Sequence, residues 1–201
     1  MRDKYYADDR DIVKWGSALC LTRRINASVI VQVAFYRPDG NPWQLSVSDQ
    51  PEPEPIAQEV IAHFRDLNYV HGLQASCGLR IEPIMREWTL ARDQYVTDVI
   101  EEIGTCRSPR VILLDPDTGI APRHPTLEHV TTDEIRRIYN ALEPGDSLAV
   151  YQHRWREPNW LDLAKERFVG AINVDARRIV VMSCFDLAHD VAILGVIVNR
   201  E

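Results

Sequence analysis

Side-chain groups able to do chemistry gather in one short segment, Asp115-Pro116-Asp117-Thr118-Gly119. It directly follows the bulky apolar run 110–114, which predicts a buried strand, so its polar atoms come to the end of a strand and not into the core. Two carboxylates beside a rigid proline and a glycine can bind a metal ion, or accept hydrogen bonds from an amine or hydroxyl. The alternative is a purely structural Asp-Pro turn with an Asx-type hydrogen bond and a glycine at positive φ.

A second group of candidate residues, Tyr151 to Arg156, lies at the end of the next expected strand, 147–151. It joins polar, cationic and aromatic side chains in six positions, among them Gln152, His153, Arg154 and Trp155. Such a set suits the binding of a phosphate or the stacking of a base. We therefore predict that these four residues bind substrate, beside the Asp-Pro-Asp turn.

The elements that must position these residues alternate along the chain. Apolar or β-rich runs predict strands at 28–35, 79–85, 110–114 and 147–151, and periodic segments predict helices at 55–67, 91–103 and 158–168. Thr131 and Glu134 form a capping-box pattern that predicts a further helix. The last two β-rich runs, 178–185 and 191–199, have no room for a helix between them and are expected to pair antiparallel.

This order of elements predicts an α/β fold: a Rossmann-like three-layer sandwich with a mostly parallel sheet and a C-terminal antiparallel hairpin. We expect one domain over residues 1–201, in which residues 1–27 form a helical segment that leads into the sheet. In its helix, 11–25, Ile12, Trp15 and Leu19 are expected to face the sheet and Asp9 to cap the N-terminus. Ligands of such folds bind at the carboxyl ends of the strands.

Composition narrows the classes of protein. A formal net charge of −7 argues against broad nonspecific adhesion to nucleic acid. No apolar run is long enough to span a membrane, and no signal-peptide pattern follows Met1, so we expect a cytoplasmic protein without membrane contact. The four scattered cysteines are expected to be buried free thiols. Oligomeric state cannot be predicted from these features.

Two of these motifs carry a resemblance to a known family. Asp115-Pro116 resembles the start of the Asp/Asn-Pro-Pro-Tyr motif of amino-group-directed class I S-adenosylmethionine methyltransferases, although Asp117 and Thr118 depart from it. The opening segment 5–15 is similar in part to that of the family that methylates an adenine N6 in large-subunit ribosomal RNA, through Asp11, Val13 and Lys14. The Asp-Pro-Asp-x-Gly turn and this opening also resemble small uncharacterised bacterial proteins.

The resemblance implies a methyltransferase-like protein that acts on an amine of a nucleic acid or nucleotide. Asp115 and Pro116 would orient the amine, Asp117 would support the turn, and Lys14 would contact phosphate. Tyr36, Asp39 and Gly40, after the first strand, would contact S-adenosylmethionine. That loop has one glycine and a bulky Tyr36-Arg37-Pro38 segment, so it is a degenerate version of the glycine-rich cofactor loop.

Two further functions remain open. One is a Mg²⁺-dependent phosphoesterase or nuclease, in which oxygens of an acidic rim hold the metal and Lys14 and His153 assist. The rim would consist of Asp8, Asp9, Asp11, Asp39, Asp115 and Asp117. The other is a catalytically inactive module that binds a nucleotide or a partner. All three predict that Asp115→Ala abolishes function while stability falls little, as for a carboxylate at the rim of the fold.

Overall fold

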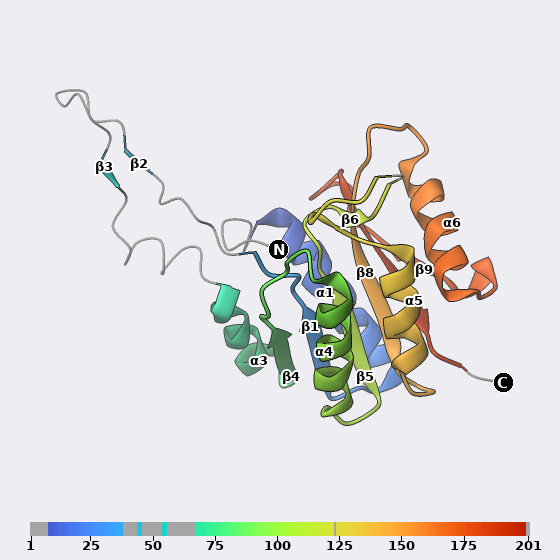
Figure 1. The fold of residues 1–201 in the computed structure, drawn as a ribbon. Coiled ribbons are helices and arrows are strands. Elements are labelled where there is room, and N and C mark those ends of the chain that lie inside the picture. The colour runs from blue at the N-terminus through green and yellow to red at the C-terminus, as the bar shows by residue number, and fades with distance from the viewer. Residues whose placement is uncertain (1–7, 38–43, 46–53, 56–66, 123, 200–201) are drawn as a thin grey trace.

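The computed structural model describes residues 8–37, 44–45, 54–55, 67–122 and 124–199 (Figure 1). Its main feature is a six-stranded sheet with the strand order β4-β1-β5-β8-β10-β9. The strands are β4 (Arg80–Ile84), β1 (Val29–Val33), β5 (Arg110–Leu114), β8 (Ser147–His153), β10 (Val191–Ile197) and β9 (Val180–Met182). Two short pairs lie outside this sheet: antiparallel β2 (Gln44–Leu45) with β3 (Glu54–Pro55), and parallel β6 (Gly119–Ile120) with β7 (His129–Val130).

The directions of the strands confirm the predicted class of fold. Strands β4, β1, β5 and β8 are parallel neighbours, whereas β10 runs antiparallel to both β8 and β9. Both neighbours of β5 are paired over most of its length, which places this apolar strand inside the sheet, as its sequence predicts. The carboxyl ends of β1, β5 and β8 therefore lie side by side at one edge.

Helices cover both faces of the sheet and complete the three-layer sandwich. The helices are α1 (Asp9–Ile25), α3 (His71–Cys77), α4 (Arg92–Gly104), α5 (Thr132–Ala141) and α6 (Trp160–Ile172), with short 3-10 turns η2 (Leu67–Val70) and η3 (Ala176–Arg178). Side chains of α4, α5 and α6 pack in one core cluster, and those of α1 and α3 pack in the other. In Figure 1, α4 and α5 lie in front of the strands and α1 lies behind them.

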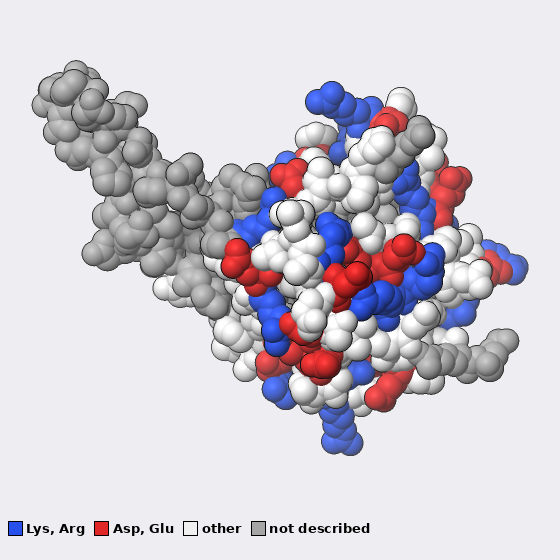
Figure 2. Space-filling model, viewed as in Figure 1, with Lys and Arg blue, Asp and Glu red and all other residues white. Residues whose placement is uncertain are grey.

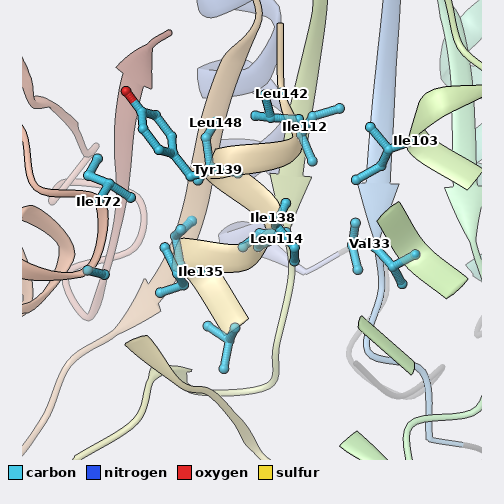
Figure 3. Close-up of a cluster of buried hydrophobic side chains, with 14 of the residues drawn as sticks. Val33, Ile103, Ile112, Leu114, Ile135, Ile138, Tyr139, Leu142, Leu148 and Ile172 are labelled. Carbon is cyan, nitrogen blue, oxygen red and sulfur yellow. The ribbon is translucent and has the colours of Figure 1, made fainter. Parts of the chain in front are cut away.

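Strand alternation divides the buried side chains between these two clusters. In β5, Ile112 and Leu114 face α4 and α5, while Val111 and Leu113 face α1. Figure 3 shows Ile135 and Ile138 of α5 on the side of the sheet to which Ile112 and Leu114 point. The next position in the alternation, residue 115, thus falls on the α1 side of the sheet.

Local sequence signals fix the ends of α5 and α1. Thr131 accepts a hydrogen bond from the Glu134 backbone N–H, and Glu134 accepts one from the Thr131 N–H, so the predicted capping box is present. The N-cap of α1 is Asp8, not Asp9, because the Asp8 carboxylate accepts the backbone N–H groups of Arg10 and Asp11.

The buried face of α1 differs from the prediction at one of its three residues. Trp15 belongs to the core cluster and Leu19 packs against it, as expected, but Ile12 is 62% exposed. Lys14, Ala18 and Leu21, at helical spacing, are also buried. The buried face of α1 therefore contains a lysine, which finds charged partners at the sheet.

Three other expectations had different outcomes. The predicted helix 55–67 lies outside the described residues except at its ends, where Pro55 belongs to β3 and Leu67 begins η2. The cysteines are free, but only Cys106 is buried and Cys184 is exposed. Within the described ranges, no helix combines the length and the apolar character that a membrane crossing requires.

Candidate ligand-binding site

A cavity of about 240 Å³ opens where the carboxyl ends of β5 and β8 meet the N-terminus of α1. Nearly all of its lining residues are polar or charged, although carbon atoms make up most of the exposed wall. The lining residues are Asp8, Arg10, Asp11, Lys14, Asp115, Pro116, Asp117, Thr118, Glu128, Tyr151 and His153. This is the edge at which ligands bind in open parallel sheets.

Strand alternation explains why polar side chains from three strands meet here. Gln32 lies between Val31 and Val33, which both belong to the core cluster of α4 and α5, so Gln32 points toward α1. Tyr151, next to Val150, points the same way. Together with Asp115, they bring an amide, a phenol and a carboxylate toward the polar end of α1.

Lys14 is the centre of a buried ionic triad. Its side chain is 1% exposed, and its Nζ lies 2.7 Å from Asp115 Oδ2 and 2.5 Å from Asp11 Oδ1. Burial opposes the ammonium charge, but Asp115 and Asp11 outweigh it and raise the pKa of Lys14 above its ordinary value. Lys14 therefore remains charged at neutral pH, and its ammonium is a counter-charge shared by the Asp11 and Asp115 carboxylates.

Asp115 uses one of its two oxygens for these contacts. Oδ2 accepts hydrogen bonds from Lys14 Nζ and from Gln32 Nε2, each at 2.7 Å. Within the described part of the chain, Oδ1 has no hydrogen-bond donor, while Asp115 lines the cavity. The carboxylate is thus held in a fixed orientation by one oxygen and offers the other to a ligand.

A second ionic group lies beside the cavity and joins the start of α1 to the turn before β10. Arg10 Nη2 lies 2.5 Å from Asp190 Oδ2 and its Nη1 lies 3.1 Å from Asp8 Oδ2. His153 Nε2 lies 3.1 Å from the same Asp190 oxygen. Although partial burial opposes it, the bond from Arg10 lowers the pKa of Asp190, which keeps this carboxylate ionised.

The Asp-Pro-Asp turn itself is held by its neighbours. Asp117 forms an ion pair with Arg37, which also lies 3.5 Å from Glu128. Gly119 has φ of +103°, and a Cβ there would meet the Gln152 side chain at 2.6 Å. Gln152 Nε2 donates to the Thr118 carbonyl, and its Oε1 accepts the Ile120 N–H. Gly119 therefore has the positive φ expected of a glycine in a structural turn, and this turn also borders the cavity.

The structure brings together five of the predicted site residues: Lys14, Asp115, Pro116, Asp117 and His153 all line the cavity. It does not bring the others there. Gln152 is fully buried and supports the turn, so it is not on the cavity wall. Lys14 is enclosed by carboxylates and cannot serve as the phosphate contact that the resemblance implies.

Arg154 and Trp155 also point elsewhere. Arg154 is exposed outside the cavity, and the Trp155 ring packs under the Arg167 guanidinium at 5.0 Å. Of the predicted cofactor residues, Tyr36 pairs with Glu87 beside β1 and is not part of the cavity wall, while Asp39 and Gly40 lie outside the described residues.

Three residues at or beside the cavity are absent from the sequence prediction: Arg10, Glu128 and Asp190. Tyr151 begins the predicted binding segment 151–156 but was also counted within the strand 147–151, whereas β8 continues to His153. Two-residue alternation from the apolar Val150 could have identified it as a polar side chain on the α1 face. For Asp190 the sequence holds no comparable signal, because its pairing with Arg10 spans 180 positions.

The end of β1 gives a test of the cofactor loop. Phe35 has φ of +46°, a conformation that favours glycine, yet its ring is buried and packs against Trp88 and Tyr95 at centroid distances of 5.0 and 5.5 Å. The backbone bend of a cofactor loop is present, but an aromatic ring fills the space beside it. The described residues of this turn do not fit a methyl donor bound as in a glycine-rich loop.

A metal site finds little support in the described ranges. There, no group of three or more His, Cys, Asp or Glu side chains is arranged to hold a metal ion. Asp11 and Asp115 are drawn together by the Lys14 ammonium, which takes the position between them that a cation would need.

Comparison with protein-family models gives no match for this sequence, and comparison with curated proteins likewise gives none. The fold and the site define the chain as an α/β three-layer protein with a polar cavity at the carboxyl edge of its sheet.

Proposed function

We propose that this chain is a methyltransferase-like protein whose cavity receives an amine of a nucleotide or nucleic-acid base. The observation that carries the proposal is the position of Asp115 and Pro116 in the wall of a cavity at the carboxyl ends of β5 and β8. Asp115 is oriented through Oδ2 and presents Oδ1. An oriented carboxylate oxygen accepts a hydrogen bond from an amine and holds its nitrogen in place.

Contact between two distant segments supports this proposal. The resemblance to amino-group methyltransferases rests on the opening segment, with Asp11 and Lys14, and on the Asp-Pro turn. These segments meet directly, because Lys14 Nζ bonds Asp115 Oδ2 across 101 positions of sequence. The antiparallel β10 next to β8 agrees with the same resemblance.

A specific observation favours a second candidate, a binding module of the same fold without methyl transfer. It is the buried Phe35 ring at the end of β1, where the family has small residues. If this turn excludes the donor, the amine site would serve recognition only. The phosphoesterase alternative has no comparable support, because the Lys14 ammonium already lies between Asp11 and Asp115, two carboxylates of the acidic rim.

Calorimetric titration with S-adenosylmethionine, S-adenosylhomocysteine and adenosine, with and without Mg²⁺, tests these candidates. Micromolar binding of S-adenosylmethionine or of its demethylated product, S-adenosylhomocysteine, supports the methyltransferase proposal. Adenosine binding without donor binding supports the binding module. A Mg²⁺-dependent heat that is lost with Asp115→Ala would instead support the phosphoesterase.

Two substitutions at Asp115 separate the acceptor role from the role in folding. Asp115→Ala and Asp115→Asn both remove the charge opposite Lys14, so their losses of stability are comparable. Only Asn keeps an oxygen that can accept from an amine. We expect Asn to retain part of the binding and Ala to abolish it, with Asp133→Asn, an exposed position on α5, as a control. Equal binding by Ala and wild type would contradict the proposal.

A further inference from the structure

The size of the cavity limits what enters it. Its volume of about 240 Å³ lies below the roughly 300–1,000 Å³ of sites that enclose drug-sized ligands. A single base or a small amine fits this space better than a whole nucleotide. Any sugar and phosphate attached to that group would remain outside.

Charged side chains of both signs surround the cavity. Three cations of the described residues lie at or beside it, and each contacts two carboxylates. These are Lys14 with Asp11 and Asp115, Arg10 with Asp8 and Asp190, and Arg37 with Asp117 and Glu128. These three cations are therefore already engaged by carboxylates of the protein.

Figure 2 shows the side of the molecule on which α4 and α5 lie in front of the sheet. Lys and Arg are interspersed with Asp and Glu over the described residues of this side, without a broad basic area.

Tyr151 adds a second hydrogen-bonding group to the cavity wall. Its side chain is 7% exposed, and its hydroxyl is open to the cavity and bonds none of the residues that the structure describes. Burial and the nearby Asp115 carboxylate raise the pKa of Tyr151, so the phenol stays protonated and can both donate and accept.

Asp115 and Tyr151 together match the hydrogen-bonding capacity of an amino group. An exocyclic amine has two N–H donors. Asp115 Oδ1 and the Tyr151 hydroxyl are two acceptors in the wall of one cavity, and neither is used by the described residues. A carbonyl oxygen in place of the amine could accept from the Tyr151 hydroxyl but not from the Asp115 carboxylate, so the preference for an amine comes from Asp115.

We infer that Tyr151 is a second ligand-binding residue of this cavity, and that together with Asp115 it binds an amine-bearing group. This inference rests on the proposed function for the identity of the site and adds the class of its ligand. The amine donates to Asp115 Oδ1 and to the Tyr151 hydroxyl.

Calorimetry with four probes tests the inference: adenosine, inosine, adenosine monophosphate and the diamine putrescine. We expect wild type to bind adenosine about tenfold more tightly than inosine, which has a carbonyl in place of the amine. Adenosine monophosphate carries the same amine and measures whether a phosphate adds to binding. Tyr151→Phe should weaken adenosine binding about five- to tenfold.

Tyr139→Phe is the matched control, because Tyr139 is 9% exposed and lies in the core cluster on the other face of the sheet. Equal binding of adenosine and inosine, with the monophosphate tightest, would overturn the inference and leave nucleotide binding intact. Putrescine binding that depends on Tyr151, without adenosine binding, would support the inference and contradict the nucleotide ligand. If no amine binds, or if Tyr151→Phe acts no more than Tyr139→Phe, the inference fails.

Discussion

Lys14 offers the sharpest test of how the site is held together. The substitution Lys14→Met keeps a side chain of similar length on α1 and removes the ammonium. Asp11 and Asp115, whose side chains are 9% and 4% exposed, then lose the cation at 2.5 and 2.7 Å. Two buried carboxylates without a counter-charge repel each other and are poorly hydrated, so the folded state is strongly destabilised.

The magnitude follows from the burial of the triad. Removing one partner of a buried ion pair costs about 3–5 kcal/mol, because the charge left behind is uncompensated. For a chain of 201 residues this lowers Tm by roughly 6–20 °C. Urea unfolding, followed by the fluorescence of the five tryptophans, measures the change in the free energy of unfolding. Lys165→Met, at a half-buried lysine of α6 outside the cavity wall, is the control.

A combined variant separates charge from packing. Asp11→Asn, Lys14→Met and Asp115→Asn together replace the triad by neutral groups of similar shape, and such replacements are often close to neutral in stability. We expect the triple variant to recover most of the stability that Lys14→Met loses. A loss below about 1 kcal/mol for Lys14→Met, which is the range of exposed ion pairs, would refute the buried triad.

Three further predictions concern the turn, the helix that follows it and the loop between them. Gly119→Ala should destabilise the fold by more than about 1 kcal/mol, since the residue has φ of +103° and the new Cβ would meet Gln152; unchanged urea unfolding would contradict this geometry. Thr131→Ala should cost about 1 kcal/mol by removing the capping box of α5, whereas Thr97→Ala, at an exposed position inside α4, should cost less. Burial lowers the pKa of His129, so the stability that its neutral form contributes is complete above the unfolded pKa of about 6.5 and is lost as pH falls below it. The urea midpoint should therefore drop between pH 7.5 and pH 5, and His129→Gln should reduce that drop; an equal drop in both proteins would count against this role.

Much of the fold follows from patterns that act locally. The apolar run 110–114 forms a central strand because both of its faces and both of its edges are covered. Thr131 and Glu134 start a helix because their side chains satisfy backbone N–H groups within three residues. Such signals depend on neighbours in the sequence, so one sequence is enough to find them.

The face of α1 shows where local reasoning fails. Ranking positions by hydrophobicity places Ile12 against the sheet, but Ile12 is 62% exposed and Lys14 is buried. The reason lies 101 positions away in Asp115, whose charge makes burial of a lysine favourable. No periodicity within α1 contains that information. The same limit applies to Asp190, which pairs with Arg10 only because the chain returns through β9 and β10.

The segment after β8 fails for a different reason. Gln152, His153, Arg154 and Trp155 were grouped as one binding set because they are adjacent, yet successive residues of an extended chain point in opposite directions. His153 thus reaches the cavity wall, while Gln152 points into the turn below it. Tyr151, assigned to the strand for its β propensity, shares the α1 face with Asp115.

Stability and ligand selection depend on the same side chains at this edge of the sheet. The sequence predicts that Asp115→Ala costs little stability, but Asp115 is 3% exposed and carries half of the counter-charge of Lys14. A loss of activity in that variant would therefore not distinguish a lost ligand contact from a weakened fold. Tyr151 allows the distinction, because its hydroxyl bonds none of the described residues and its removal leaves the ionic triad intact. A defect in Tyr151→Phe that affects amine binding but not urea unfolding would assign part of that binding to a group that the fold itself does not require.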